Sequence, residues 1–399
     1  MIEKIIKNKL IDIHFQPIVS IRTKKIYAFE ALCRCTYNNQ NLPPELLFKL
    51  AKEKGLLLEL DLLAREIAIE KFAPYYKQNN DLTLFLNFES SLINDYESIL
   101  SINSFIETII KNEIPFKNFV LEIKEDEVTN VEALEKFSTT YKDLGFFIAL
   151  DDFGTGSSTF DRINLIRPDI IKIDKSLFDN LSNNLINKEI VKAIAKMSHN
   201  LGIIVLAEGV EEEESICIGM KSTINLFQGY YFCKPALQIN KEIENTIVNK
   251  TIEIGKNFKL RNINSINKKR KAINRYDFIT ENIISKIDNL DNTHNTFKKS
   301  FDELDDVEAI FLIDTISGKQ IDDTIVTKNI NKRFKPTKDG HEHFLKEYYY
   351  ITLESRKGIF LSQKYISYAT GSLCKTFAKR FSIGSKSYIL CMDIVIDKR

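Results

Sequence analysis

The sequence predicts an α/β barrel in which eight strands are surrounded by helices, followed by a smaller second domain. Strand-like apolar runs recur between residues 11 and 230, and most of them are separated by helical stretches. The first two runs, 11–19 and 25–33, are joined by a loop too short for a crossover, so this pair must be antiparallel. The remaining length of the 399-residue chain suits a second domain.

The other elements of the barrel follow in order. Pro43-Pro44 opens a helix that Gly55 closes, and a second helical stretch covers residues 56–76. Six further buried strands are expected, most of them with helices between them: 82–88, 119–123, 147–152, 169–174, 203–208 and 224–230. This alternation is typical of a TIM-like (β/α)8 barrel, here with one antiparallel strand at its start.

Composition narrows the class of protein. A hydrophobic content of 44% and a charged content of 28% fit a soluble globular chain. The formal charge of +1 gives no reason to expect polymeric nucleic acid or a membrane as partner. The N-terminus lacks the apolar segment of a signal peptide, and no apolar run is long enough to span a membrane. Six scattered cysteines without paired CxxC motifs favour a cytoplasmic location.

Polar residues stand at or near the ends of seven strands. They are Glu30, Asn87, Glu122, Asp151, Lys172, Glu208 and Gln228. Barrels of this type carry their chemistry at the carboxyl ends of the strands, so these side chains are expected to converge on one rim. Buried carboxylates cost several kcal/mol unless they are paired or bound to metal, and hard oxygen ligands suit Mg²⁺ or Mn²⁺.

Asp151 and Asp152 are adjacent carboxylates at the end of an apolar run, and Gly154 and Gly156 follow in a tight loop. Such neighbours repel each other unless a positive group holds both ionised. A pair of divalent ions about 3.5–4 Å apart, bridged by one of the two aspartates, would do so. The alternative is an aspartate pair that caps a helix.

At these residues the chain resembles the EAL-domain family of cyclic di-GMP phosphodiesterases, over roughly residues 10–238. The matching motifs are Gln16-Pro17-Ile18, Glu30-Ala31-Leu32, Leu121-Glu122-Ile123-Lys124-Glu125, Asp151 to Gly156, Lys172-Ile173-Asp174, Ala207 to Glu211 and Gln228-Gly229-Tyr230. Ser157 departs from the family, which usually has an aromatic residue there, and Cys35 stands where a tryptophan is common.

The resemblance implies hydrolysis of cyclic di-GMP to linear pGpG with two Mg²⁺ or Mn²⁺ ions. It implies metal ligands at Glu30, Asn87, Glu122, Asp151, Asp152 and Glu208, with Asp151 bridging the two ions. Catalytic roles fall to Lys172, which would touch the attacking water, to Glu208, and to Glu125 and Glu211 behind the ligands. Substrate contacts fall to Gln16, Leu32, Arg34, Asp152 and Gln228.

Simpler interpretations stay open for three of these residues. Lys172 can form an ion pair with a carboxylate of the barrel, Gln228 can be a hydrogen-bonded polar group at the barrel mouth, and Arg34 can form a surface ion pair. A catalytically silent receptor of cyclic di-GMP and an interaction protein built on the barrel scaffold are the alternatives to an enzyme.

The tail after the barrel predicts a helical linker at 241–305 and a second domain at 306–399. Residues 241–275 are rich in Lys and Arg, which indicates a solvated helix face or an anionic partner. Residues 276–302 are read as a connecting helix that could pair with its copy in a homodimer. Strands are expected at 310–313, 358–362, 375–381 and 387–394.

Residues 365–381 resemble the Cache (PAS-like) sensor domains. The resemblance implies an α+β module that binds an unknown small molecule. His341 and His343 could ligate a metal or lie exposed on a loop.

Overall fold

The computed structural model describes residues 1–94, 103–124, 128–155, 160–301, 304–327, 333–396. By its contacts the chain divides into two units, Met1–Leu260 and Arg261–Arg399. The strands of the first unit are β1 (Ile11–Ser20), β2 (Lys25–Tyr37), β3 (Gln40–Leu42), β4 (Thr83–Asn87), β5 (Phe119–Lys124), β6 (Phe147–Phe153), β7 (Ile170–Ile173), β8 (Ile204–Ala207) and β9 (Leu226–Phe227). Its helices are α1 (Ile2–Lys7), α2 (Pro44–Glu53), α3 (Leu57–Gln78), α5 (Asn103–Lys111), α6 (Val131–Leu144), α7 (Phe160–Ile166), α8 (Lys175–Phe178), α9 (Leu185–Asn200), α10 (Glu213–Lys221) and the first part of α11 (Lys241–Ile284).

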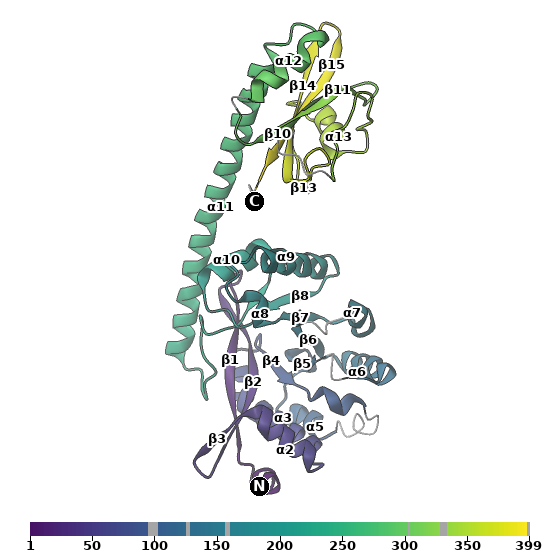
Figure 1. Ribbon diagram of the computed structural model, residues 1–399. Helices are drawn as coiled ribbons and strands as arrows, with labels where there is room; N and C mark the ends of the chain where they lie inside the picture. The colour runs from purple at the N-terminus through teal and green to yellow at the C-terminus, as the bar shows by residue number, and fades with distance from the viewer. Residues whose placement is uncertain (95–102, 125–127, 156–159, 302–303, 328–332, 397–399) are drawn as a thin grey trace. The chain divides into compact units, whose positions relative to one another are not determined.

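Eight of these strands close a barrel in the order β1-β9-β8-β7-β6-β5-β4-β2, and β2 returns to β1. Strand β1 is antiparallel to both of its neighbours, whereas the other neighbouring pairs around the barrel are parallel. The predicted barrel with one antiparallel strand is therefore confirmed (Figure 1). Two elements were not predicted from the sequence: β3, a short strand that pairs with the end of β2, and helix α1.

The interior of the barrel begins with an apolar layer. Each of the eight strands contributes one buried residue: Ile18, Ala28, Phe85, Val120, Ala149, Ile170, Leu206 and Leu226. Side chains alternate between the two faces of a strand, so the next inward residue lies two positions further along. The inward residues two positions beyond the floor therefore form the next layer of the interior.

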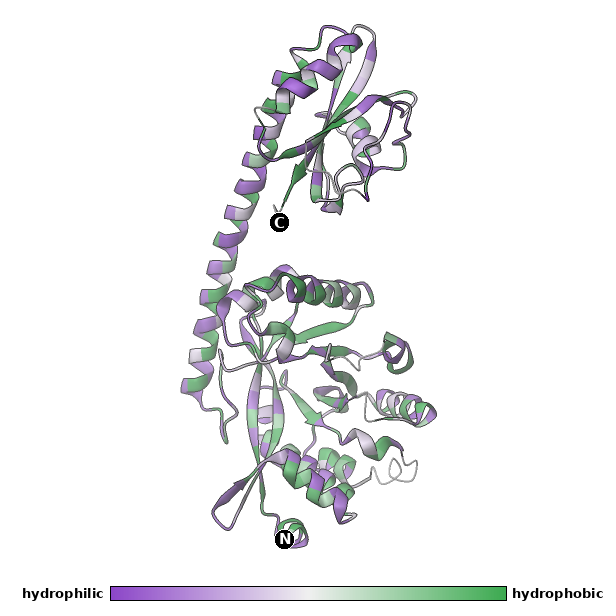
Figure 2. Ribbon diagram, in the orientation of Figure 1, coloured by the Kyte–Doolittle hydropathy of each residue, from purple (hydrophilic) through white to green (hydrophobic). Residues whose placement is uncertain are grey.

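A larger apolar core lies between the strands and the surrounding helices. Figure 2 shows helices of mixed colour, with hydrophobic and hydrophilic residues on the same helix, as expected for helices that cover a sheet. Helix α6 illustrates the local signals: the Asn130 side chain accepts a hydrogen bond from Ala133 N at its start, and Gly145 ends it with a left-handed backbone.

The second unit is built on an antiparallel sheet. Its strands are β10 (Val307–Asp314), β11 (Gln320–Val326), β12 (Ile359–Leu361), β13 (Tyr365–Ile366), β14 (Leu373–Ile383) and β15 (Lys386–Val395), in the order β11-β10-β15-β14-β12 with β13 beside β14. Helices α12 (Thr293–Ser300) and α13 (Glu347–Glu354) belong to the same unit. The four strands expected here are confirmed, while β11, with two adjacent aspartates, was missed.

Two expectations for the tail need correction. Residues 276–302 are not one helix, because α11 ends at Ile284 and α12 begins at Thr293. His343 is neither exposed nor a lone loop residue: it is 2% exposed, and its ring nitrogens lie 2.8 Å from Tyr348 Oη and 3.0 Å from Gln320 Oε1. Burial lowers the pKa of His343 to about 3, so the ring is neutral and serves as a hydrogen-bonding core residue.

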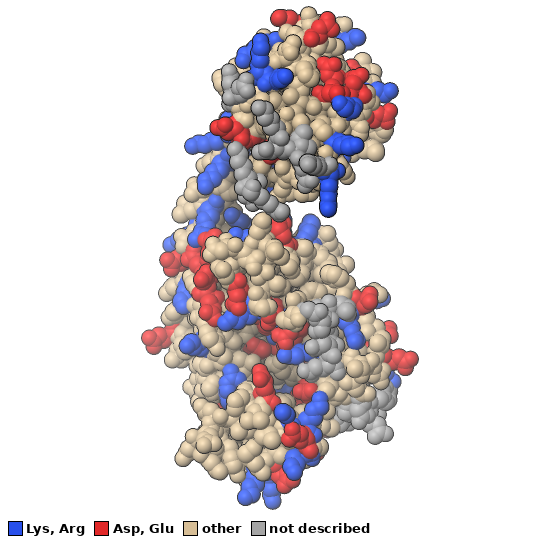
Figure 3. All heavy atoms as spheres, in the orientation of Figure 1, with Lys and Arg blue, Asp and Glu red and all other residues tan. Residues whose placement is uncertain are grey.

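None of the helices in the described ranges is both long and apolar enough to cross a membrane. On the face of the first unit drawn in Figure 3, acidic and basic side chains are intermixed. The cluster Lys268–Lys271 is exposed on helix α11.

Candidate metal and phosphodiester site

A ring of polar side chains lies directly above the apolar floor of the barrel. Two residues beyond each floor residue toward the mouth stand Gln16, Glu30, Asn87, Glu122, Asp151, Lys172, Glu208 and Gln228. In β1 the step runs backward along the chain because that strand is antiparallel. The period of two thus brings together every one of the seven strand-end residues singled out from the sequence, with Gln16 as the eighth.

Lys172 is the centre of this ring. Its ammonium nitrogen lies 2.7 Å from Glu208 Oε1, 2.8 Å from Glu122 Oε1, 2.8 Å from Asp151 Oδ1 and 3.5 Å from Glu30 Oε1. The side chain is only 1% exposed. The expected ion pair of Lys172 with a barrel carboxylate is therefore present, and it involves four carboxylates.

Burial and ion pairing shift the pKa values of the ring's residues in different directions. Burial raises the pKa of Glu122 well above its ordinary value, although the charge of Lys172 opposes this, and burial also raises the pKa of Glu208 to about 8. Burial acts on Asp151 in the same direction, but Lys172 outweighs it and the pKa of Asp151 is lowered. Burial would favour a neutral Lys172, yet the surrounding carboxylates hold its pKa well above the usual range. One ammonium group therefore does not neutralise this ring.

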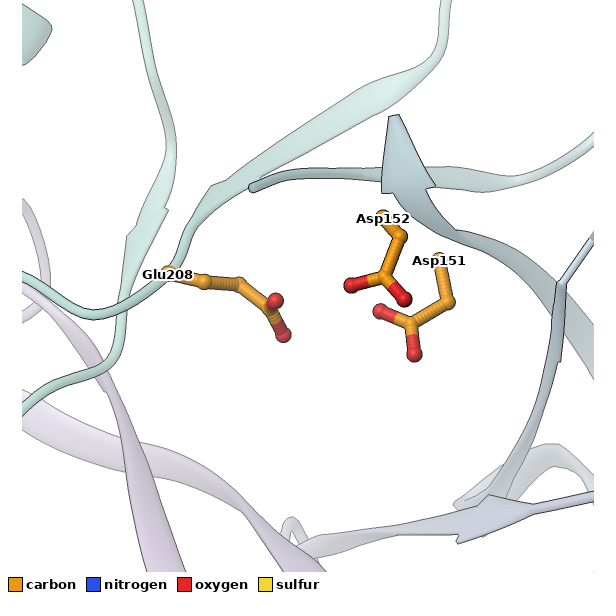
Figure 4. Close-up of side chains that lie close together, drawn as sticks. All are labelled: Asp151, Asp152 and Glu208. Atoms are coloured by element: carbon orange, nitrogen blue, oxygen red, sulfur yellow. The ribbon is translucent and has the colours of Figure 1, made fainter. Parts of the chain in front are cut away.

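Asp152 reaches the ring because its backbone adopts an unusual conformation. Alternation along β6 should point it away from Asp151, but its φ is +53° and the register between β6 and β7 shifts at this point. As a result, oxygen atoms of Asp151, Asp152 and Glu208 all lie within 4.8 Å of one another. Figure 4 shows the carboxylates of Asp151 and Asp152 at the end of one strand, facing Glu208 from another.

These residues fit divalent cations. Glu122 Oε2 and Gln228 Oε1 are buried without a hydrogen-bond partner among the described residues. Five carboxylates (Glu30, Glu122, Asp151, Asp152 and Glu208) are accompanied by two lysine ammonium groups, Lys172 and Lys124. Buried oxygen atoms that lack a hydrogen-bond donor, among carboxylates that outnumber the nearby ammonium groups, are what a hard divalent ion requires.

Amide side chains connect the ring. Gln228 Nε2 donates to Glu30 Oε2 at 2.5 Å and to Gln16 Oε1 at 3.2 Å. Asn87 Nδ2 lies 3.4 Å from Glu30 Oε1, and Gln16 Nε2 donates to Cys233 O at 3.2 Å. Gln228 is thus the hydrogen-bonded polar group that the simpler interpretation described, and it also orients Glu30.

A cavity of about 460 Å³ opens beside the ring, and both Leu32 and Arg34 line it together with Asn87 and Glu122. Arg34 donates from Nη1 to Cys33 O at 2.8 Å and forms no ion pair with any residue in the described part of the chain. The surface ion pair considered for Arg34 is therefore not found there.

One predicted residue lies apart from the ring. Glu211 is exposed, and its Oε1 lies 2.7 Å from Lys175 Nζ. Glu125 lies outside the described residues, and so does Ser157.

Sequence reasoning missed two features near the ring. Lys124 lies two residues after Glu122 and places its ammonium 2.5 Å from Asp152 Oδ2; this spacing was the signal that could have revealed it. Asp61 and Arg65 form a buried ion pair on α3, and Asp61 Oδ1 also accepts from Glu89 N at 3.3 Å. No sequence signal marks that pair beyond its spacing of four residues.

Comparisons with known proteins agree with this geometry. The sequence matches the family described as "EAL domain" over residues 1–235. It is 27% identical over 234 residues to the cyclic di-GMP phosphodiesterase PdeA of Borreliella burgdorferi, covering 58% of this chain and 34% of that protein. It is 29% identical over 243 residues to the probable cyclic di-GMP phosphodiesterase PdeG of Escherichia coli, covering 60% of this chain and 47% of that protein. The chain thus spans between a third and a half of the length of these curated relatives.

Among solved structures, the Bacillus subtilis YkuI protein is similar over its whole length. The TM-score is 0.84 at 19% identity, with all of both chains covered, and that protein has an EAL domain in complex with substrate c-di-GMP and calcium. At this identity the likeness establishes the fold. Together with the match over residues 1–235, these findings show that the chain belongs to the EAL domain family.

Proposed function

We propose that this chain is a cyclic di-GMP phosphodiesterase that hydrolyses one phosphodiester bond to give linear pGpG. The observation that carries the proposal is the cluster of four carboxylates around Lys172, in which Glu122 Oε2 has no hydrogen-bond donor among the described residues. The names of PdeA and PdeG support the same substrate, although each is much longer than the matched segment.

Two divalent ions, Mg²⁺ or Mn²⁺, would be held by this ring. Glu30, Asn87, Glu122 and Asp151 would hold one ion, and Asp151, Asp152 and Glu208 the other. When bound, such ions lower the pKa of a water and neutralise charge that develops on the phosphoryl oxygens. The oxygen-rich donor set suits these ions better than zinc.

The chain's own residues would bind and orient the substrate. Arg34 and Leu32 line the cavity, where Arg34 would meet a phosphate and Leu32 would make apolar contact with a base. Gln16 and Gln228 would offer amide groups to the substrate from the ring above the barrel floor. Lys172 would position the attacking water, because its ammonium is held by four carboxylates at the centre of the ring. Asp152 would contact the substrate as well as an ion.

Glu125 and Glu211 would act behind the ligands. Glu211 is joined to Lys175 at 2.7 Å, and Lys175 begins the helix that follows the strand of Lys172. This contact would steady the chain around the ring.

Product analysis tests the proposal. The full chain is incubated with cyclic di-GMP and either Mg²⁺ or Mn²⁺, and the nucleotides are separated by chromatography. We expect pGpG from the wild type and loss of at least about tenfold in Glu30→Ala, because that carboxylate accepts from Gln228 and lies near Asn87. Glu189→Ala removes an exposed glutamate on α9 and should leave turnover unchanged.

The alternatives give different results in the same experiment. A folded wild-type chain that binds cyclic di-GMP but leaves it uncut with both ions would be a silent receptor. A chain that does not bind the nucleotide would point to an interaction protein built on the barrel.

We also propose that residues 306–399 form a PAS-like sensor for a small molecule and that 241–305 link it to the 1–240 phosphodiesterase domain. The antiparallel sheet of the second unit, with helices α12 and α13, supports this. Homodimerisation is part of the proposal, and sedimentation of the full chain tests it. The six free cysteines suit a reducing cytoplasm.

A further inference from the structure

Lys124 lies beside the ring but belongs to neither proposed set of metal ligands. It is the last residue of β5, and its side chain shares the inward face with Glu122. Across the sheet it is aligned with Asp151 of β6. This placement gives the ring a second lysine, which lies at the rim and not at the centre.

The two lysines of the ring differ in how tightly they are held. Lys172 is 1% exposed and lies against four carboxylates. Lys124 is 46% exposed, and its ammonium lies 2.5 Å from Asp152 Oδ2. An ammonium on a long, half-exposed side chain can move into water at little cost, so Lys124 is the exchangeable cation of the two.

Asp152, the ion-pair partner of Lys124, belongs to the cluster of carboxylates that is best placed to hold a second divalent ion. Asp152 has oxygen atoms within 4.8 Å of those of Asp151 and Glu208. A divalent ion in that group must share Asp152 with the ammonium or displace it. In either case the positive charge of Lys124 opposes the ion.

We propose that Lys124 is an internal cation that competes with the second divalent ion for Asp152. This inference rests on the proposed function, because it assumes that the ring binds metal. Lys124 holds the Asp152 carboxylate in place while that ion is absent, and it sets the concentration of free metal at which the second position fills. The chain's metal requirement is thereby tuned by one side chain outside the ligand set.

Metal binding by the full chain tests this without any turnover. Mn²⁺ is titrated into EDTA-treated protein without nucleotide, and free Mn²⁺ is followed by electron paramagnetic resonance. Lys124→Met, which keeps the length of the side chain and removes the charge, should tighten the weaker of two sites roughly three- to tenfold. Lys124→Arg keeps the charge and should bind as the wild type does.

Lys241→Met is the matched control. Lys241 is also solvent-exposed and forms an ion pair of 2.7 Å, but with Glu244 on helix α11, outside the ring. It should leave Mn²⁺ affinity unchanged, and thermal melting shows that each variant is folded. Equal or weaker Mn²⁺ binding by Lys124→Met would overturn the role of Lys124 while leaving the proposed function intact. Failure of the wild type to bind Mn²⁺ would overturn both.

Discussion

Replacing Lys172 by methionine removes an ammonium group that lies 2.7–3.5 Å from four largely buried carboxylates. Methionine is unbranched and of similar length, so the substitution chiefly removes charge and little packing. The four carboxylates are left without their common partner. We therefore expect a large loss of stability in the metal-free protein.

The size of the loss follows from burial. Removing one partner of a buried ion pair costs about 3–5 kcal/mol, and a unit of this size shifts its melting temperature by about 2–4 °C per kcal/mol. The barrel unit of metal-free Lys172→Met should melt roughly 6–20 °C below the wild type. Mn²⁺ should restore more of the melting temperature in the variant than it adds to the wild type, if its ring still binds the ion.

The loss of stability in metal-free Lys172→Met should grow as the pH rises. Glu208 has a folded-state pKa of about 8 against an ordinary 4.5, so it binds more protons folded than unfolded. The stability that this proton uptake contributes is fully present below pH 4.5 and is lost as the pH rises through about 8. Without Lys172 the carboxyl groups are harder still to ionise, so the variant should be more sensitive to alkali than the wild type.

Far-UV circular dichroism of EDTA-treated protein at pH 6 and pH 8.5, with and without Mn²⁺, measures these differences. Lys175→Met loses only an exposed ion pair and should change stability by less than about 1 kcal/mol. A metal-free Lys172→Met protein that melts with the wild type at pH 8.5 would refute the reasoning, because the ammonium would then not be what balances the ring.

Two further predictions concern the barrel around the site. Asp61→Ala should destabilise the barrel by about 3–5 kcal/mol in thermal melts, because Arg65 would stay buried between two phenylalanine rings without its carboxylate; a melt like that of the wild type would contradict this. Gly229→Ala should reduce folded yield or product formation at least about tenfold, because its Cβ would lie 2.1 Å from Val210 O, and backbone cannot move aside easily. Gly255→Ala, with open space around a helical position, should be neutral or stabilising in the same melts.

Much of the site could be predicted from local sequence. Strand alternation is a property of the chain itself, so an apolar floor residue followed two positions later by Glu30, Glu122 or Asp151 already implies an inward carboxylate. The short link between β1 and β2 likewise required an antiparallel pair. These features depend on residues close together in the chain, and the closed barrel confirms them.

Other features depend on local backbone geometry or on contacts between residues that are far apart in the chain. Asp152 reaches the ring only because its φ is +53°, and alternation would have turned it outward. The sequence alone suggested that His343 lies exposed on a loop or ligates a metal. In the structure it is hydrogen-bonded to Gln320 and Tyr348, which lie 23 and 5 residues away in the chain. A sequence shows a polar residue, but it does not show which distant group satisfies it.

The sequence alone determined which residues face the barrel interior, because side-chain direction in a strand repeats every two residues. Only the tertiary structure decided how charge is shared among them. Lys172 contacts four carboxylates, the most distant of them 142 residues away in the chain, and Lys124 forms an ion pair with the fifth, Asp152. Coulomb energies depend on distances across the closed barrel, and those distances exist only once all eight strands are in place.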